Sequence, residues 1–170
     1  MSSNDAAALL AAGNEVLQRE GVLLDDQRWD DWLALFAPDC EFWMPTWRSD
    51  EVLGSDPRTE VSHMYYSSRA GLEDRVLRIR SRRSPASMPM ARTAHLVTAV
   101  LPLEAPSDDR MKLRSTWSCH VFAPRTQTQH VFFGSSEHEL ERRDGNWLIR
   151  RKKVMLKNDY IPTMLDIHCV

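Results

Sequence analysis

The N-terminal part of the sequence places its apolar residues with the period of a helix. Within residues 9–24 they fall on one stripe, which a helix buries against the rest of the protein. Ser2 and Asp5 resemble a capping box at the start of this helix, and Gly13 inside it weakens the helix slightly. The stripe consists of two series of residues spaced by seven: Leu9, Val16 and Leu23, and Leu10, Leu17 and Leu24.

A second, shorter helix is expected directly afterwards. Pro38 would end it, because proline lacks the backbone N–H and clashes with the preceding turn. Residues 41–44 then predict a strand and residues 48–60 a polar loop. A third helix is expected over residues 72–80, followed by a proline-containing loop over residues 84–90. The second helix is predicted from four residues at helical spacing: Trp29, Trp32, Leu33 and Phe36.

The rest of the chain predicts a β-sheet. Residues 94–101 are apolar on both faces, which predicts a central strand, and residues 111–121 alternate as in a half-buried antiparallel strand. Residues 129–140 and 147–156 predict two more strands, joined by a hairpin turn at 143–146, where Asp-Gly tolerates positive φ. Helices followed by antiparallel strands indicate an α+β fold, in which a strongly curved sheet wraps around the long helix.

Composition narrows the class of protein without identifying a function. The 170 residues suit a single domain, 1–170, and 42% are hydrophobic and 27% charged, as in an average globular protein. A formal charge of −2 disfavours a nucleic-acid-binding protein. The sequence shows neither a membrane-spanning apolar run nor a signal peptide, so a cytoplasmic location is expected. In that reducing compartment Cys40, Cys119 and Cys169 are expected to be thiols.

Several segments resemble the small (beta) subunits of the aromatic-ring-hydroxylating dioxygenases that act on benzoate, toluate, anthranilate and halobenzoate. The resemblance runs from about residue 15 to the end of the chain. The blocks most specific to this branch are Leu72-Glu73-Asp74-Arg75 and Lys157-Asn158-Asp159-Tyr160. All the segments that carry the resemblance are 24–33, 36–39, 41–45, 65–66, 71–76, 78–79, 92–95, 150–154 and 156–161.

The resemblance implies a fold, partners and a reaction. The fold is a ketosteroid-isomerase-like cone, whose curved antiparallel sheet holds the N-terminal helices. Three small and three large (alpha) subunits would form a mushroom-shaped hexamer. The large subunit would carry a Rieske [2Fe-2S] cluster and a mononuclear Fe(II), and a reductase would supply electrons from NADH. Such a complex adds both atoms of dioxygen to the ring and gives a cis-dihydrodiol, which makes this chain a structural subunit that is inactive alone.

The residues of the chain itself predict no metal or cofactor site. A Rieske centre needs two cysteines and two histidines in paired clusters, whereas the three cysteines here are isolated. Mononuclear iron needs two histidines and a carboxylate on one side. His130 and His138 share a predicted strand, but at roughly 3.3 Å per residue they lie about 26 Å apart. Catalytic, cofactor-binding and metal-binding residues are therefore expected to be absent from this chain.

A stand-alone cone-fold dehydratase or isomerase is the alternative. Its candidates for proton transfer are Asp31, Tyr65, Tyr66 and His95. In the non-catalytic interpretation Asp31 is solvated, the tyrosines pack at the sheet edge, and His95 is hydrogen-bonded in the core or at an interface. The alternative requires an open pocket inside the cone. Five aromatic residues are expected to fill that space: Trp29, Trp32, Phe36, Trp43 and Trp117.

Two basic clusters and the C-terminal tail are expected to make contacts. Nearby acidic residues disfavour a nucleic-acid role for the clusters, so part of each is expected to be solvated and part to pair with acids across a subunit contact. Residues 161–167 are too apolar to hang free and should dock on their own sheet or on a neighbouring subunit. A plain interaction module without an oxygenase partner is a third interpretation. The clusters are Arg75, Arg78, Arg80, Arg82 and Arg83, and Arg150, Arg151, Lys152 and Lys153.

Overall fold

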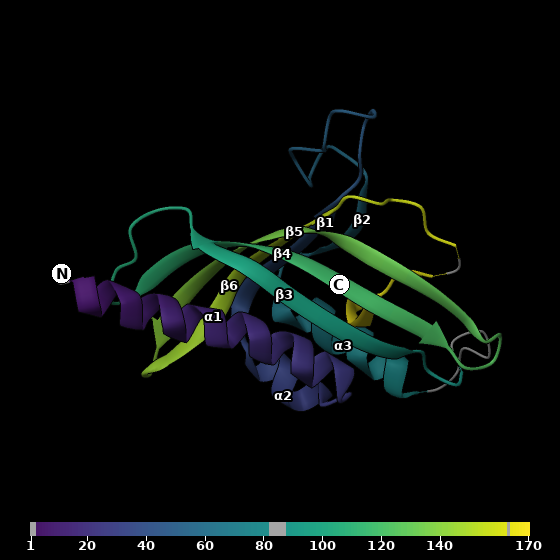
Figure 1. Ribbon diagram of the computed structural model, residues 1–170, viewed down its shortest axis with the longest axis horizontal. Coiled ribbons are helices and arrows are strands. Elements are labelled where there is room, and N and C mark those ends of the chain that lie inside the picture. The colour runs from purple at the N-terminus through teal and green to yellow at the C-terminus, as the bar shows by residue number, and fades with distance from the viewer. Residues whose placement is uncertain (1–2, 82–87, 163) are drawn as a thin grey trace.

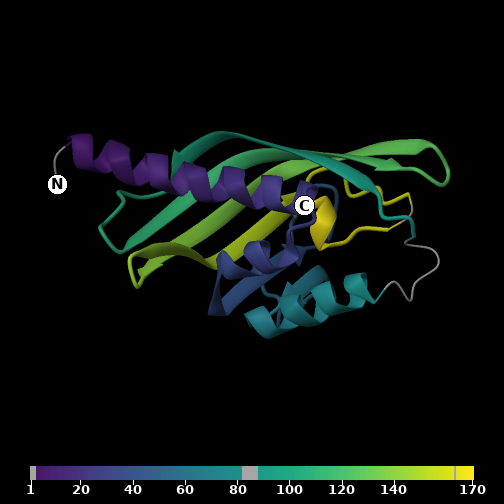
Figure 2. The ribbon, with the colours of Figure 1, turned by 90° about the horizontal axis from the view of Figure 1, so that it is seen from below.

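The computed structural model describes residues 3–81, 88–162 and 164–170. Over these residues the helices lie together on one side of a long, curved, open sheet (Figure 1, Figure 2). This arrangement confirms the predicted α+β fold with a curved sheet over the N-terminal helices. The helical elements are α1 (Ser3–Asp25), α2 (Trp29–Ala34), α3 (Arg69–Arg80) and a C-terminal 3-10 turn, η2 (Ile167–Cys169).

The sheet has the strand order β2-β1-β6-β5-β4-β3. Its neighbouring strands are antiparallel, as predicted, except for β1 and β6, which are parallel. That pair joins an early strand to the last one, so the open sheet is complete only when both halves of the chain are present. The strands are β1 (Phe36–Pro45), β2 (Ser62–Tyr66), β3 (Arg92–Pro102), β4 (Arg110–Ala123), β5 (Thr128–Arg143) and β6 (Asn146–Leu156).

Two glycines let α1 approach the inner face of the sheet closely. A Cβ atom at Gly13 would overlap the side chain of Met111, and one at Gly21 would lie 2.9 Å from Cβ of His95. Gly13 weakens an isolated helix, but here it makes room for the sheet. Ser2, part of the predicted capping box, lies outside the described residues. The predicted apolar stripe does face the sheet, and its most buried members are Leu17, Leu23 and Leu24.

The second helix is shorter than predicted. It ends at Ala34, and Phe36 already begins β1. Pro38 therefore does not end the helix but lies within a strand. Pairing with β6 is interrupted there, because Phe36 pairs with Ile149 and regular pairing resumes only at Glu41. Proline is tolerated at such an irregularity because no ladder hydrogen bond depends on its missing N–H.

The other elements largely follow the sequence pattern. Helix α3 begins at Arg69, three residues before the predicted start. The turn at 143–146 is confirmed, with Asp144 at φ 50° and Gly145 at φ 81°. Strands β4, β5 and β6 are confirmed, each a little longer than predicted. Residues 84–87 of the predicted proline-containing loop lie outside the described residues. In the part that the structure describes, no helix is both long and apolar enough to cross a membrane.

Strand β3 lies at an edge of the sheet and is not the central strand that its apolar pattern predicts. Only β4 pairs with it, and the side chain of Leu96 on its outer face is 52% exposed. The free edge of β3 faces α1. There the Gln18 amide donates to the Val97 carbonyl (2.8 Å), and Asp25 accepts from the His95 backbone N–H (2.8 Å). The helix thus satisfies backbone groups that a neighbouring strand would otherwise pair with.

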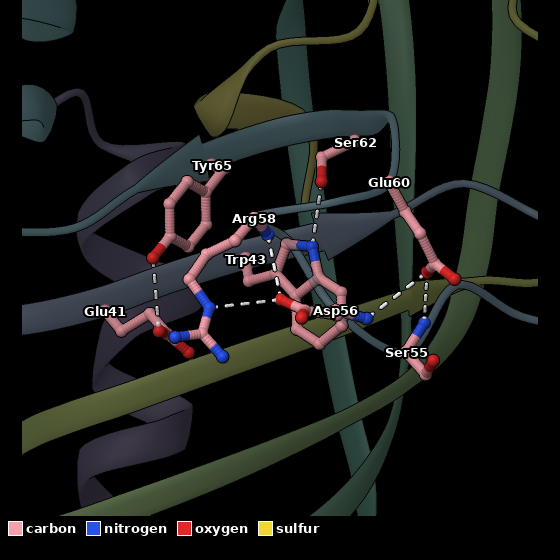
Figure 3. Close-up of polar contacts among 8 residues, drawn as sticks. All are labelled: Glu41, Trp43, Ser55, Asp56, Arg58, Glu60, Ser62 and Tyr65. Carbon is pink, nitrogen blue, oxygen red and sulfur yellow. Dashed lines mark hydrogen bonds and ion pairs between the residues drawn. The ribbon is translucent and has the colours of Figure 1, made fainter.

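Trp43 lies on the outer face of the sheet, so the prediction that it fills the cone is wrong. Its neighbours in register are Tyr65 on β2 and Lys153 on β6. Its Nε1 donates to Ser62 Oγ at 2.9 Å (Figure 3). Lys153 Nζ lies 4.7 Å from its ring centroid. The other aromatic residues expected inside the cone are part of the core, namely Trp29, Trp32, Phe36 and Trp117.

Candidate functional site

The residues predicted for proton transfer do not meet in the fold. Asp31 on α2 is exposed and pairs with Arg28 at 2.8 Å. Tyr66, with its neighbour Tyr65, lies on β2 at one edge of the sheet, whereas His95 lies on β3 at the opposite edge. The interpretation that Asp31 is solvated and the tyrosines pack at the sheet edge is therefore confirmed.

His95 is held by Asp25, the last residue of α1. His95 Nδ1 lies 2.6 Å from Asp25 Oδ1, to which the Thr93 hydroxyl also donates (2.8 Å). Burial raises the pKa of the Asp25 carboxyl, but the hydrogen bonds from His95 and Thr93 outweigh it and keep that pKa below its usual value. The other ring nitrogen, Nε2, is buried and has no hydrogen-bond partner among the described residues. The His95–Asp25 pair can transfer a proton only if a substrate reaches Nε2 of His95.

A second polar group, which the sequence analysis missed, fills the centre of the cone. Lys152 Nζ lies 2.8 Å from Glu20 Oε1 and donates to the Val170 carbonyl at 3.3 Å. His138 Nε2 lies 3.3 Å from the other oxygen of Glu20. These three side chains are each at most 5% exposed. The group therefore links the first helix, the last two strands and the C-terminus inside the fold.

The electrostatics of this group favour a fixed ion pair. Burial raises the pKa of Glu20, but the charge of Lys152 and the hydrogen bond from His138 outweigh it and lower that pKa to about 2. Burial lowers the pKa of His138, so its imidazole is neutral at neutral pH. A carboxylate with so low a pKa is a poor general base, because a base works best when its pKa is near the operating pH.

The cavity beside these residues is too small for an organic substrate. Its volume is about 20 Å³, and its walls include His95, Trp117, His138 and Lys152. That is room for about one water molecule, whereas ligand pockets typically measure roughly 300–1,000 Å³. The nitrogen of His95 thus faces a space that no benzoate-sized molecule enters. This cavity therefore offers no room for a substrate beside His95.

The buried ion pair had a signal in the sequence. Glu20 lies three residues after Leu17 and four before Leu24, on the apolar stripe of α1. Lys152 is in phase with Val154, on the inner face of β6. An ionisable residue at a core position requires a partner. The basic run of β6 was predicted to lie at a contact surface, but strand alternation places Lys152 on the inner face.

Members of both basic clusters pair with acids of the same chain, and the expectation that part of each cluster pairs across a subunit contact stays a prediction. Arg151 Nε lies 2.7 Å from Glu41 Oε1, and Arg80 lies 2.7 Å from Asp30. These pairs tie neighbouring strands and helices together. Arg82 and Arg83 lie outside the described residues.

The C-terminal tail docks on its own chain, which is one of the two predicted alternatives. Arg75 on α3 makes a bidentate contact with Asp166, at 2.7 and 2.6 Å. Asp166 also accepts from the Ile167 N–H and so caps η2. Ile167 and Val170 are then buried in the core. The tail is therefore part of the fold itself.

Comparison with known proteins assigns the family. The family model described as "Ring hydroxylating beta subunit" matches residues 19–163. The chain belongs to this family. It is 42% identical over 159 residues to toluate 1,2-dioxygenase subunit beta of Pseudomonas putida, an alignment that covers 94% of this chain and 96% of that protein.

Solved structures agree with this assignment. The beta subunit of benzoate 1,2-dioxygenase from Burkholderia mallei matches the ring-hydroxylating beta subunit described here with a TM-score of 0.78 and 35% identity, over 94% of this chain and 96% of that one. A hexachlorocyclohexane dehydrochlorinase matches with a TM-score of 0.64 at 16% identity, over 99% of this chain and 97% of that one. The latter likeness shows that the cone fold is shared and nothing about the reaction.

The two sequence blocks most specific to the resemblance have structural roles in this beta subunit. Arg75, from the first block, holds the C-terminal tail. Asn158, from the second block, pairs with β5 just beyond the end of β6. Its Oδ1 accepts from the Phe133 N–H (2.9 Å), and its Nδ2 donates to the Val131 carbonyl (2.7 Å). The side chain thus continues the backbone pairing that β6 no longer supplies.

The donor atoms of the beta subunit do not fit a Rieske cluster or a mononuclear iron. Cys40, Cys119 and Cys169 are free, buried thiols, as predicted. Burial raises the pKa of Cys40 to about 11 and that of Cys169 to about 12. Across residues 3–81, 88–162 and 164–170, no three His, Cys, Asp or Glu side chains are grouped as a metal site.

Proposed function

We propose that this beta subunit is the structural, non-catalytic small subunit of a Rieske non-haem iron oxygenase that cis-dihydroxylates a benzoate-like aromatic acid. The observation that carries the proposal is the closed interior, where the Glu20–Lys152 pair and a cavity of about 20 Å³ leave no room for an aromatic acid. The substrate class is supported by relatives named for toluate and benzoate. The reaction then takes place in another chain, and this chain contributes no catalytic, cofactor-binding or metal-binding residue.

The partner that this function requires is a large subunit carrying the Rieske [2Fe-2S] cluster and the mononuclear Fe(II). Electrons reach it from NADH through a reductase, and the oxygenase is a cytoplasmic hexamer of three large and three small chains. The small chains support assembly of the large ones. This division of labour is supported by the three cysteines, which are buried, free thiols in this chain.

Reconstitution tests the proposal. The chain is co-expressed with the large subunit of a benzoate-type dioxygenase, and the purified complex is supplied with reductase, NADH, dioxygen and benzoate. We expect a cis-dihydrodiol from the complex and none from this chain with reductase alone. We also expect the large subunit to assemble poorly without it. A large subunit that assembles and turns over equally well in its absence would remove the supporting role.

A further inference from the structure

Two buried ring nitrogens on the inner face of the sheet have no hydrogen-bond partner among the described residues, and both rings line the cavity beside α1. They are Nε2 of His95 on β3 and Nε1 of Trp117 on β4. Each side chain is only 5% exposed. A buried polar group without a partner costs free energy, so both nitrogens require one.

The two nitrogens require opposite kinds of partner. The Asp25 carboxylate faces both the backbone N–H and Nδ1 of His95, and it can only accept, so Nδ1 carries the hydrogen. In the neutral imidazole Nε2 is then an acceptor, whereas the indole Nε1 of Trp117 is always a donor. The two do not bond directly. A small group between them that both accepts and donates would satisfy both.

A third buried nitrogen beside the cavity is also an acceptor. Nε2 of His138 lies 3.3 Å from Glu20 Oε2, so Nε2 carries the hydrogen and the neutral ring leaves Nδ1 as an acceptor. Burial lowers the pKa of His138, which favours this neutral form. Nδ1 is buried and has no partner in the described part of the chain. The cavity is thus bordered by side chains that offer one donor and two acceptors.

The size of the cavity suits one water molecule. Its volume is about 20 Å³, and a single water needs roughly 10–15 Å³ of such space and two to four polar partners. The walls also include Ser115 and Ser136, which pair across β4 and β5 and are 1% and 3% exposed. A cavity of this size with apolar walls stays dry, whereas one with polar walls binds water.

The chemistry of the walls excludes other small occupants. A cation has no lone pair with which to accept from Nε1 of Trp117, and a chloride ion has no hydrogen to donate to Nε2 of His95. The charges of Glu20 and Lys152 already satisfy each other at 2.8 Å, so the cavity offers an ion no unpaired opposite charge. Water is small, uncharged, and both a donor and an acceptor.

We propose that this cavity is a binding site for one water molecule, which accepts from Nε1 of Trp117 and donates to Nε2 of His95 and Nδ1 of His138. The water connects the Asp25–His95 pair to the buried ion pair between α1 and β6, so the polar groups inside the cone form one network. It also occupies the nitrogen with which His95 would otherwise take up a proton. The proposal concerns the interior of this chain alone and does not depend on the proposed function.

A high-resolution crystal structure of the full chain tests the site directly. We expect one well-ordered water at full occupancy within roughly 3.2 Å of all three nitrogens. Crystals soaked in bromide should show no anomalous peak in the cavity, because an anion cannot donate to His95. An empty cavity, a bromide peak inside it, or a water that leaves any of the three nitrogens out of hydrogen-bond distance overturns the proposal.

Trp32 provides a matched control for the same test in solution. Its Nε1 is also buried and has no partner among the described residues, but Trp32 does not line this cavity. Rotating-frame Overhauser spectra should show a cross-peak between water and the indole N–H of Trp117, and none at Trp32. The sign of the cross-peak distinguishes a bound water from hydrogen exchange, and Trp117→Phe and Trp32→Phe assign the two signals. Equal cross-peaks at both indoles, or none at Trp117, contradict the proposal.

Two substitutions at Ser115 test whether the water stabilises the fold. Ser115→Val places methyl groups in the cavity and displaces the water, which should lower the folding equilibrium constant by about tenfold or more because buried donors and acceptors lose their partner. Ser115→Ala leaves the water in place and should have a smaller effect. A dry cavity predicts the reverse order, because valine would fill it and also favours strands. Urea titration in which Ser115→Val is the more stable variant overturns the proposal.

Discussion

Lys152 on β6, the last strand along the chain, and Glu20 near the end of the first helix form an ion pair at 2.8 Å, with both side chains 5% exposed. Their residues are 132 positions apart in the chain. Taking two charges out of water is costly, and the pair offsets that cost only while both members are present. The pair therefore joins the two halves of the fold and makes each half dependent on the other.

Removing one member of the pair should strongly destabilise the protein. Lys152→Met leaves Glu20 buried without its cation, which should lower the free energy of unfolding by roughly 3–5 kcal/mol. Lys153→Met, on the outer face of the same strand, is the matched control and should change it by less than about 1 kcal/mol. Urea titration of both variants measures the difference.

A double variant distinguishes the loss of the attraction between the two charges from the cost of leaving one charge buried without a partner. Glu20→Leu together with Lys152→Met replaces the pair by apolar side chains and should recover most of the loss. Equal losses for Lys152→Met and Lys153→Met would show that position 152 is as solvated as position 153.

Acid should weaken the fold through the same group. The pKa of Glu20 is about 2 in the folded state against 4.5 for an ordinary glutamate, so the unfolded chain takes up the proton first. Its contribution to stability is complete above pH 4.5 and is lost as the pH falls from 4.5 to about 2. The lowered pKa of His138 acts in the same direction, because the unfolded imidazole protonates first as the pH falls below 6.5.

Urea titrations at a series of pH values check this dependence. Glu20→Gln should show a shallower loss of unfolding free energy than the parent between pH 4.5 and 2. Glu15→Gln, on the exposed side of the same helix, should keep the parent slope. A Glu20→Gln variant with the parent slope would mean that other carboxylates cause the acid sensitivity.

The register of β4 was predictable because one of its faces is buried. Its buried and more exposed residues alternate from Met111 to Cys119, and a slip by one residue would turn Trp117 to the solvent. The place of β3 was not predictable, since an apolar strand at an edge has the same pattern as a central one. The edge position of β3 is recognised from the hydrogen bonds that the side chains of Gln18 and Asp25 form with its backbone. These bonds depend on where α1 lies in the folded chain.

Trp117 offers a direct test of that register. Its side chain is 5% exposed, so Trp117→Ala should cost roughly 3–5 kcal/mol by opening a cavity in the core. Phe133 on the neighbouring strand points to the outer face and is 45% exposed, so Phe133→Ala in the isolated monomer should cost less than about 1 kcal/mol. Chemical denaturation at low protein concentration gives both values. Reversed costs would show that the two faces of the sheet have been interchanged.

Two differences between the predicted and observed elements come from contacts between residues far apart in the chain. Pro38 ends a helix in isolation, but pairing of β1 with β6 places it at an irregularity of a strand. Trp43 was expected inside because it is large and apolar, yet strand alternation turns it outward, where Ser62 and Lys153 cover it. Long-range pairing decides both positions, and the local pattern does not contain it.

The proposed supporting role predicts that acid–base chemistry is dispensable in this chain. Asp31→Asn, Tyr66→Phe and His95→Gln keep much of the side-chain shape and remove the capacity for proton transfer. In the reconstituted oxygenase each should leave turnover within a few-fold of the parent. Loss of a true general acid or base typically costs about 100- to 10,000-fold. Product formation per assembled complex is the quantity to measure.

His95→Gln is the informative member of this set, because His95 also binds Asp25 at 2.6 Å. Its replacement should lower the free energy of unfolding while turnover per assembled complex stays close to that of the parent. Assembly and iron content must therefore be measured alongside turnover. Asp31 and Tyr66 serve as controls, since one is exposed and the other lies at the far edge of the sheet. A large loss of turnover in a fully assembled, fully metallated His95→Gln complex would place working chemistry, or a coupling to it, inside this chain.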